Sequence, residues 1–158
     1  MTDVELLADE ALARGIRIAV AESLTSGALA TTLGRGHDAS TWFAGAIVAY
    51  GTDVKVRVLG VPDDVDPCSA ECAEQLAVGA RELMRADIAI SATGVGGPDA
   101  EGGHPPGTVY VGWATGGVPG HRLLHLSGEP ADVLAATVAH CVSLLGELVR
   151  QAPHSGRG

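Results

Sequence analysis

The sequence is poor in aromatic residues and in positive charge. Only five of its 158 residues are aromatic, and the formal net charge is −9. A core with so few aromatic side chains must consist mainly of Ala, Val, Leu and Ile, which is typical of helices packed on a β-sheet. The acidic balance, with no basic cluster to offset it, argues against a nucleic-acid-binding surface. A small-molecule ligand is the better expectation.

Cysteines and long apolar runs are also scarce. The chain has three cysteines, an odd number, with no signal peptide and no uninterrupted apolar run of about 18 residues. We therefore expect a reduced, cytoplasmic protein that does not enter a membrane.

The sequence does not favour a metal site. Cys68 and Cys72 lack a second pair of soft ligands nearby, so buried or helix-start thiols are favoured over a metal site. His121 and His125 have metal-ligand spacing only on a helix, and their surroundings predict a strand, where they would lie about 13 Å apart.

The length fits one domain, predicted over residues 1–151 and followed by a disordered tail at 152–158. Thr2 and Glu5 have the spacing of a capping box, and Gly15 ends the first helical pattern. Hydrophobic periodicity then predicts alternating strands and helices. The strands are expected at 16–21, 43–50, 87–92, 108–114 and 122–126, and the later helices at 28–33, from Ser69 or Ala70 to 85, and from Pro130 onward.

This order of elements predicts an α/β fold. Helical crossovers join the first three strands, which should therefore be parallel, whereas the last two form a hairpin with at least one antiparallel strand. We expect a three-layer α/β/α sandwich with a mixed, mostly parallel five-stranded sheet.

The segment from Gly94 to Gly107 is rich in glycine and proline and follows a predicted strand. Such a loop can present bare backbone N–H groups to an anion or a carbonyl, although a merely long turn has the same composition. It is not a P-loop, because it contains no lysine. It is not a dinucleotide fingerprint, because Asp99 replaces the third small residue and Pro98 stands where a helix should begin.

Two other segments leave the carboxyl ends of predicted parallel strands. Residues 22–27 carry three hydroxyl side chains at a strand–helix junction, where plain N-capping needs only one. The turn from Tyr50 to Lys55 contains the only lysine of the chain, and a lysine near a pocket can lose its proton and act as a base. An exposed lysine without a function is the alternative. Because these ends share one edge of the sheet, the three segments should meet in one site.

Four ordered motifs resemble the CinA C-terminal domain family, whose enzymatic members are nicotinamide mononucleotide deamidases. They are AESLTSG at 21–27, Tyr50 with Lys55 and LGV at 59–61, TGVGGP at 93–98, and PGTV at 106–109. The resemblance covers about residues 3–150 and implies a three-layer α/β/α domain. It also implies hydrolysis of the nicotinamide carboxamide to a carboxylate with release of ammonia, within pyridine-nucleotide salvage.

The resemblance assigns roles residue by residue. Ser23 would be the nucleophile, Lys55 its base, and Tyr50 a hydroxyl that orients or relays the proton. No metal or cofactor is implied; the partner is a small-molecule nucleotide, and self-association into a homo-oligomer is expected. The substrate-binding residues would be Glu22, Thr25, Ser26, Gly27, Thr93, Gly94, Gly96 and Gly97.

The chain also departs from the family pattern. Leu24-Thr25-Ser26-Gly27 replaces Cys-Thr-Gly-Gly, and Gly51-Thr52 replaces Ser-Asn after the tyrosine. No arginine lies between Arg122 and Arg150, where the family often places arginines. Two alternatives therefore stay open: a catalytically silent nucleotide-binding or regulatory paralogue, and an amidohydrolase of a related carboxamide.

Overall fold

The computed structural model describes residues 1–154; the last part of the predicted tail, residues 155–158, lies outside the described residues. The chain alternates helices and strands. In order they are α1 (Asp3–Arg14), β1 (Ile18–Glu22), α2 (Ala28–Gly34), α3 (Ala39–Trp42), β2 (Phe43–Val48), α4 (Thr52–Leu59), α5 (Ala70–Met84), β3 (Ile88–Gly94), β4 (Thr108–Ala114), β5 (Gly120–His125) and α6 (Pro130–Gln151).

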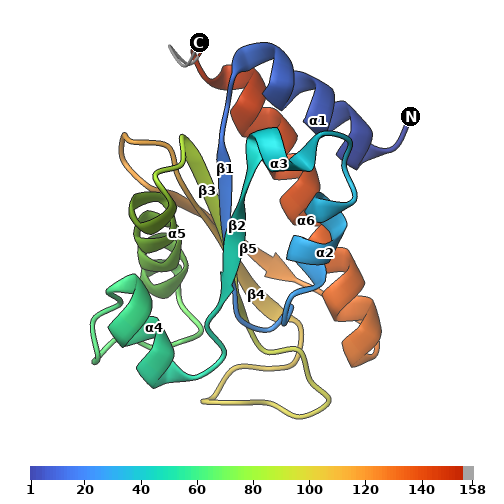
Figure 1. The fold of residues 1–158 in the computed structure, drawn as a ribbon. Helices are drawn as coiled ribbons and strands as arrows, with labels where there is room; N and C mark the ends of the chain where they lie inside the picture. Colours follow the sequence, from blue (N-terminus) through green and yellow to red (C-terminus); the bar gives the residue numbers. More distant parts are fainter. Residues whose placement is uncertain (155–158) are drawn as a thin grey trace.

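The five strands form one mixed sheet in the order β2-β1-β3-β4-β5 (Figure 1). β1 pairs in parallel with both β2 and β3, while β4 is antiparallel to β3 and to β5. Four strands thus run in one direction, and only β4 runs against them. This confirms the predicted α/β architecture with its mixed, mostly parallel sheet.

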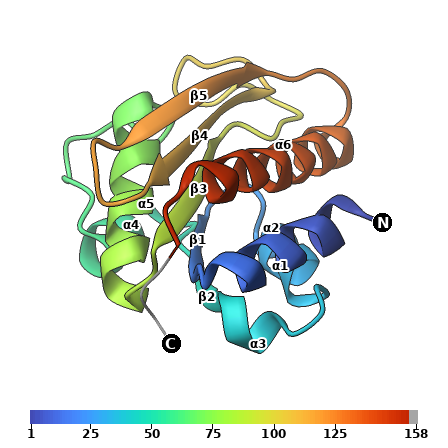
Figure 2. The ribbon, with the colours of Figure 1, turned by 90° about the horizontal axis from the view of Figure 1, so that it is seen from above.

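Helices cover both faces of the sheet, and the two layers are separate in the view from above (Figure 2). α1, α2, α3 and α6 pack on one face, where Ile18 and Val20 of β1 and Ile88 and Ile90 of β3 point into the larger hydrophobic core. α4 and α5 cover the other face over small strand residues such as Ala19, Ala21 and Ala89. Small side chains on this second face let α5 approach the sheet closely, since side-chain volume sets the distance between packed layers.

The structure confirms the predicted start and end of α1 and the predicted start of α5. Thr2 Oγ1 accepts a hydrogen bond from the backbone nitrogen of Glu5, and the Glu5 carboxylate accepts one from the Thr2 nitrogen at 2.7 Å. Gly15 ends α1 with a φ of 65°, a left-handed conformation that favours glycine. Ser69 caps α5, because its hydroxyl accepts from the Cys72 nitrogen at 3.1 Å.

The structure differs from the sequence prediction around β2. The strand expected at 43–50 ends at Val48, and β2 is an edge strand whose residues are half-buried or, at Val48, exposed. The segment from Tyr50 to Lys55 was predicted as a turn, and most of it is the start of α4. The four-residue helix α3 was also missed, because one helical turn carries no periodicity.

α6 is long and apolar enough, by length and composition alone, to cross a membrane, but half of its most apolar window is buried inside the molecule. Val133, Thr137, Cys141 and Leu145 lie buried along one face of it. A helix packed into the core of a globular domain has these same properties, so this is weak evidence for a membrane span.

Gly79 keeps α4 and α5 in close contact. A Cβ atom at this position would collide with the backbone carbonyl oxygen of Leu59 and lie 2.9 Å from its Cα atom. We expect Gly79→Ala to destabilise the fold by about 1–3 kcal/mol through overpacking, measured by urea unfolding. Gly34→Ala is the matched control, since nothing lies within 4 Å of its Cβ position; it should be neutral or slightly stabilising. Equal stability of the two variants would contradict this account of the contact.

Candidate active site

A cavity of about 410 Å³ opens at the edge of the sheet where β1 and β3 end. It lies between the glycine-rich loop, the start of α4, the linker before α5 and the first turns of α6. The lining residues include Ser23, Leu24, Tyr50, Lys55, Asp66, Cys68, Thr93, Gly94, Gly96, Gly97, Glu101, His104, Pro130 and Leu134. The three segments that the sequence predicted to converge all contribute to this wall.

Ser23 follows β1 directly and sits in a sharp turn. Its backbone nitrogen donates to the carbonyl oxygen of Ala92 on β3 at 3.0 Å, and its own carbonyl accepts from the Ser26 nitrogen at 3.1 Å. Ser26 and Gly27 both have positive φ, 49° and 102°, which reverses the chain into α2. The strand end and the turn together fix the backbone of Ser23 at the cavity wall.

Glu22, which was predicted to bind substrate, is fully buried and is not among the residues that line the cavity. Its predicted role in substrate binding stays a prediction. Its two carboxylate oxygens accept hydrogen bonds from the backbone nitrogens of Leu29 and Ala30, at 2.9 and 3.0 Å. The carboxylate therefore caps the N-terminus of α2, where its negative charge interacts favourably with the positive end of the helix dipole.

Lys55 lies in the first turns of α4 and is only 3% exposed. Its Nζ donates a hydrogen bond to the backbone carbonyl oxygen of Tyr50 at 3.2 Å. Burial lowers the pKa of Lys55, while the nearby Cys72 thiol acts in the opposite direction. A lysine held at a cavity wall with a lowered pKa is able to accept a proton.

Tyr50 lines the same cavity, and its side chain is largely exposed. The contact that the structure shows between Tyr50 and Lys55 uses the tyrosine carbonyl and not its hydroxyl. The predicted role of the hydroxyl in orienting or relaying a proton stays a prediction.

The glycine-rich loop forms another part of the cavity wall. The Thr93 hydroxyl donates to the Pro67 carbonyl oxygen at 2.6 Å and so ties the end of β3 to the linker before α5. Gly94 has a φ of 150°, and a Cβ atom there would collide with the backbone of Thr108. A Cβ atom at Gly96 would meet nothing within 4 Å, and Gly96 lines the cavity. Gly97 completes the predicted set in the wall.

The other predicted substrate-binding residues lie outside the cavity wall. Thr25, Ser26 and Gly27 belong to the turn that leads away from Ser23 into α2. The Thr25 hydroxyl is buried and has no hydrogen-bond partner within residues 1–154. Because a buried hydroxyl ordinarily finds a partner, Thr25 is the one residue of this turn whose chemistry the fold leaves unexplained.

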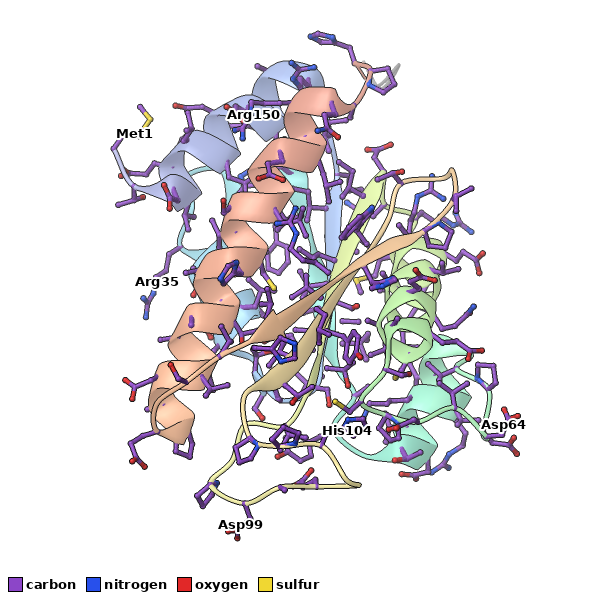
Figure 3. All side chains as sticks on the ribbon, turned by 180° about the vertical axis from the view of Figure 1, so that it is seen from behind. Met1, Arg35, Asp64, Asp99, His104 and Arg150 are labelled. Carbon is purple, nitrogen blue, oxygen red and sulfur yellow. The ribbon has the colours of Figure 1, made fainter. Side chains whose placement is uncertain are left out.

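Sequence reasoning missed two acidic residues and a histidine at the cavity. Asp66 and Glu101 line it, and the His104 ring contacts the Asp66 carboxylate at 2.8 Å. This hydrogen bond lowers the pKa of Asp66 below its ordinary value. His104 lies on the loop below the sheet edge (Figure 3), 38 residues from its partner. The acidic linker at 63–66 was visible in the sequence, but nothing in it indicated this pairing.

The cysteines are free and buried. Burial raises the pKa of Cys68 to about 11 and also raises that of Cys72, so both thiols stay protonated near neutral pH. No group of three or more His, Cys, Asp or Glu side chains within residues 1–154 is arranged to hold a metal ion. His121 lies on β5 and pairs with Glu74 at 2.9 Å.

Comparisons with known proteins agree on one family. The model of the CinA C-terminal domain matches residues 2–149. A protein of Bacillus subtilis (strain 168), provisionally named competence-damage inducible protein, is 39% identical over 142 residues, which cover 87% of this chain and 34% of the relative. A relative of the same name from Bacillus anthracis (strain CDC 684 / NRRL 3495) is 42% identical over 140 residues, which cover 83% of this chain and 34% of the relative. The chain thus spans about a third of the length of these curated relatives.

Solved structures give the same result. A CinA superfamily protein from Klebsiella pneumoniae 700603 superposes with a TM-score of 0.90 at 30% identity, covering 95% of this chain and 97% of the other. One from Escherichia coli gives a TM-score of 0.88 at 30% identity, with coverages of 92% and 88%. The fold, the cavity-lining motifs and these matches lead to one conclusion: the chain belongs to the CinA C-terminal domain family.

Proposed function

We propose that this chain is an amidohydrolase that converts the carboxamide of a nicotinamide ribonucleotide, with nicotinamide mononucleotide as the reference substrate, to a carboxylate and ammonia. The observation that carries the proposal is the shared cavity wall of Ser23 and Lys55, the chain's only lysine, which is buried there. A hydroxyl and a lysine that can be neutral form the minimal pair for serine–lysine amide hydrolysis.

The reaction proceeds in two halves. Lys55 Nζ accepts the Ser23 hydroxyl proton while Ser23 Oγ attacks the carboxamide carbon, and a tetrahedral intermediate forms. The carbon–nitrogen bond then breaks, Lys55 returns the proton to the leaving nitrogen, and ammonia departs from an ester on Ser23. Lys55 next removes a proton from water, the hydroxide attacks the ester, and the carboxylate leaves as Ser23 regains its proton.

The fold supports two further requirements of this chemistry. Gly96 and Gly97 line the cavity, and a backbone N–H group of this loop is the candidate donor to the developing oxyanion, a contact that typically contributes about 10²–10³ in rate. The Tyr50 carbonyl restrains Lys55 Nζ, which reduces the number of geometries that the base explores.

The test is ammonia release from nicotinamide mononucleotide, with mass spectrometric identification of nicotinate mononucleotide. Wild-type protein should release one ammonia for each acid formed, and Ser23→Ala should lower the rate by about 10³-fold or more. A well-folded wild type that yields no product at saturating substrate would overturn the proposal.

A second function has one observation in its favour. Glu129, Pro130 and Leu134 occupy the start of α6, where the family often has arginines, and Pro130 and Leu134 line the cavity. A nucleotide-binding or regulatory domain without catalysis would bind the mononucleotide and release no ammonia. Calorimetric binding measured beside the ammonia assay separates the two functions.

A further inference from the structure

We infer that the cavity selects a positively charged carboxamide without a phosphate group, namely a pyridinium nucleoside such as nicotinamide riboside, over its phosphorylated nucleotide. This inference rests on the proposed function, since it identifies the substrate class for the same site. Four features of the cavity carry it: the acidic side chains in its wall, the fixed position of Lys55, a wall that contains no arginine from residues 1–154, and the chemistry of the α6 N-terminus.

The wall is acidic away from Ser23. Asp66 and Glu101 both line the cavity, and the Asp66 side chain is 51% exposed despite its contact with His104. Glu101 is exposed, and its backbone forms a bridge to His104 within the loop. A ligand in the cavity therefore meets carboxylates on the linker and on the glycine-rich loop.

In the described part of the chain, the basic side chains of the wall, Lys55 and His104, are both engaged in other contacts. Lys55 is buried, and its ammonium or amine group is bound to the Tyr50 carbonyl. His104 is bound to Asp66. Within residues 1–154, no arginine lines the cavity, although arginine is the side chain best suited to bidentate phosphate binding.

The helix end at the cavity is also unsuited to an anion. Pro130 and Leu134 of α6 line the wall, and a helix N-terminus usually attracts phosphate through its free N–H groups. Here Pro130 has no N–H to offer, and the Asp132 carboxylate accepts a hydrogen bond from the Glu129 nitrogen at 2.9 Å. Two carboxylates, from the N-cap Glu129 and from Asp132 in the first turn, already offset the positive end of the helix dipole.

The charges of the two ligands differ enough to decide between them. A pyridinium nucleoside carries +1, whereas its monophosphate carries about −1 near neutral pH, because the phosphate adds about −2. Asp66 and Glu101 attract the ring cation of both ligands. The same carboxylates repel the phosphate of the nucleotide, which has no unengaged cationic side chain to bind it in the described part of the wall. The net effect favours the unphosphorylated compound.

Two measurements test the inference separately from the proposed function. Binding of nicotinamide riboside and of nicotinamide mononucleotide to Ser23→Ala is measured by calorimetry, so that no turnover is needed. Ammonia release from each compound is measured with wild-type protein. We expect the riboside to bind about tenfold more tightly and to show the higher kcat/KM.

Each outcome has one meaning. Tighter binding of the riboside supports the inference even if neither compound releases ammonia, in which case only the proposed hydrolysis fails. Equal or tighter binding of the mononucleotide overturns the inference, whether or not it is hydrolysed. Undetectable binding of both compounds at millimolar concentration also overturns it.

Charge variants identify the source of the preference. Leu134→Arg places a cation on the cavity wall and should shift the binding ratio toward the mononucleotide by about tenfold, and Glu101→Gln should shift it in the same direction by a smaller factor. Glu82→Gln is the matched control, because Glu82 is exposed on the last turn of α5 and does not line the cavity. A ratio that stays unchanged in Leu134→Arg and Glu101→Gln overturns the electrostatic origin.

Discussion

Replacing Lys55 with methionine should lower ammonia release by about 10³-fold or more while leaving the fold at least as stable as wild type. The loss follows from removal of the proposed base, the lysine that shares the cavity wall with Ser23. The retained or increased stability follows from burial, because a buried ammonium is costly and a methionine of similar length is not. Ammonia assays and thermal unfolding of the same preparations check both parts.

Lys55→Arg is the control for charge alone. Arginine keeps a positive charge but cannot give up its proton, so this variant should be as inactive as Lys55→Met. An active Lys55→Arg enzyme would contradict the assignment of Lys55 as the base, because it would show that the site needs only a cation there.

The pH dependence of the rate has a defined sign. Lys55 accepts a proton only when neutral, and burial lowers its pKa, so kcat/KM should rise with pH and level off below the ordinary lysine pKa of about 10.4. The unfolded chain binds this proton more tightly than the folded chain. Stability should therefore also increase with pH between the lowered pKa and the ordinary one, and Lys55→Met should lose this contribution.

Glu22→Ala should cause the largest loss of stability among the site's neighbours, about 3–5 kcal/mol. The substitution removes two hydrogen bonds from backbone nitrogens to a buried carboxylate and leaves the N–H groups of Leu29 and Ala30 without acceptors. Urea unfolding measures the loss, which corresponds to a fall in Tm of about 10 °C or more. The turn that holds Ser23 follows Glu22 directly, so activity should fall with stability.

Two other variants separate a structural role of Glu22 from substrate binding. Glu22→Gln keeps one acceptor oxygen and should lose less stability than the alanine variant. Glu82→Ala, at an exposed position, should stay within about 0.5 kcal/mol of wild type. A Glu22→Ala protein that unfolds like wild type but shows a raised KM would contradict the capping role and support the predicted role in substrate binding.

The sequence predicted the fold well where periodicity was long or the end signals were strong. The capping box at Thr2, the cap at Gly15 and the start of α5 at Ser69 agree with the structure. α4 was missed because it has only eight residues and begins without a side-chain cap. Two features of the sequence are typical of a helix here: Asp53 and Arg57 are spaced to form an ion pair, and Gly60 can end a helix in a left-handed conformation. Gly51 favoured a turn instead.

The candidate site could be predicted in part, because the order and direction of the strands determine where the segments that form it lie. Ser23, Lys55 and the glycine-rich loop meet because each follows a parallel strand at the same sheet edge. The orientation of the turn after Ser23 could not be predicted, because it depends on the positive φ of Ser26. The Asp66–His104 contact joins two exposed segments, and no periodic pattern encodes such a pairing.

The covalent intermediate tests the central claim most directly. Wild-type protein mixed with excess nicotinamide mononucleotide, quenched in acid within milliseconds to seconds, is digested and analysed by mass spectrometry. The account predicts an ester of the nicotinate nucleotide on the peptide that contains Ser23, absent from Lys55→Met and from Ser23→Ala. Steady ammonia release without any such ester, together with full activity of Ser23→Ala, would contradict it.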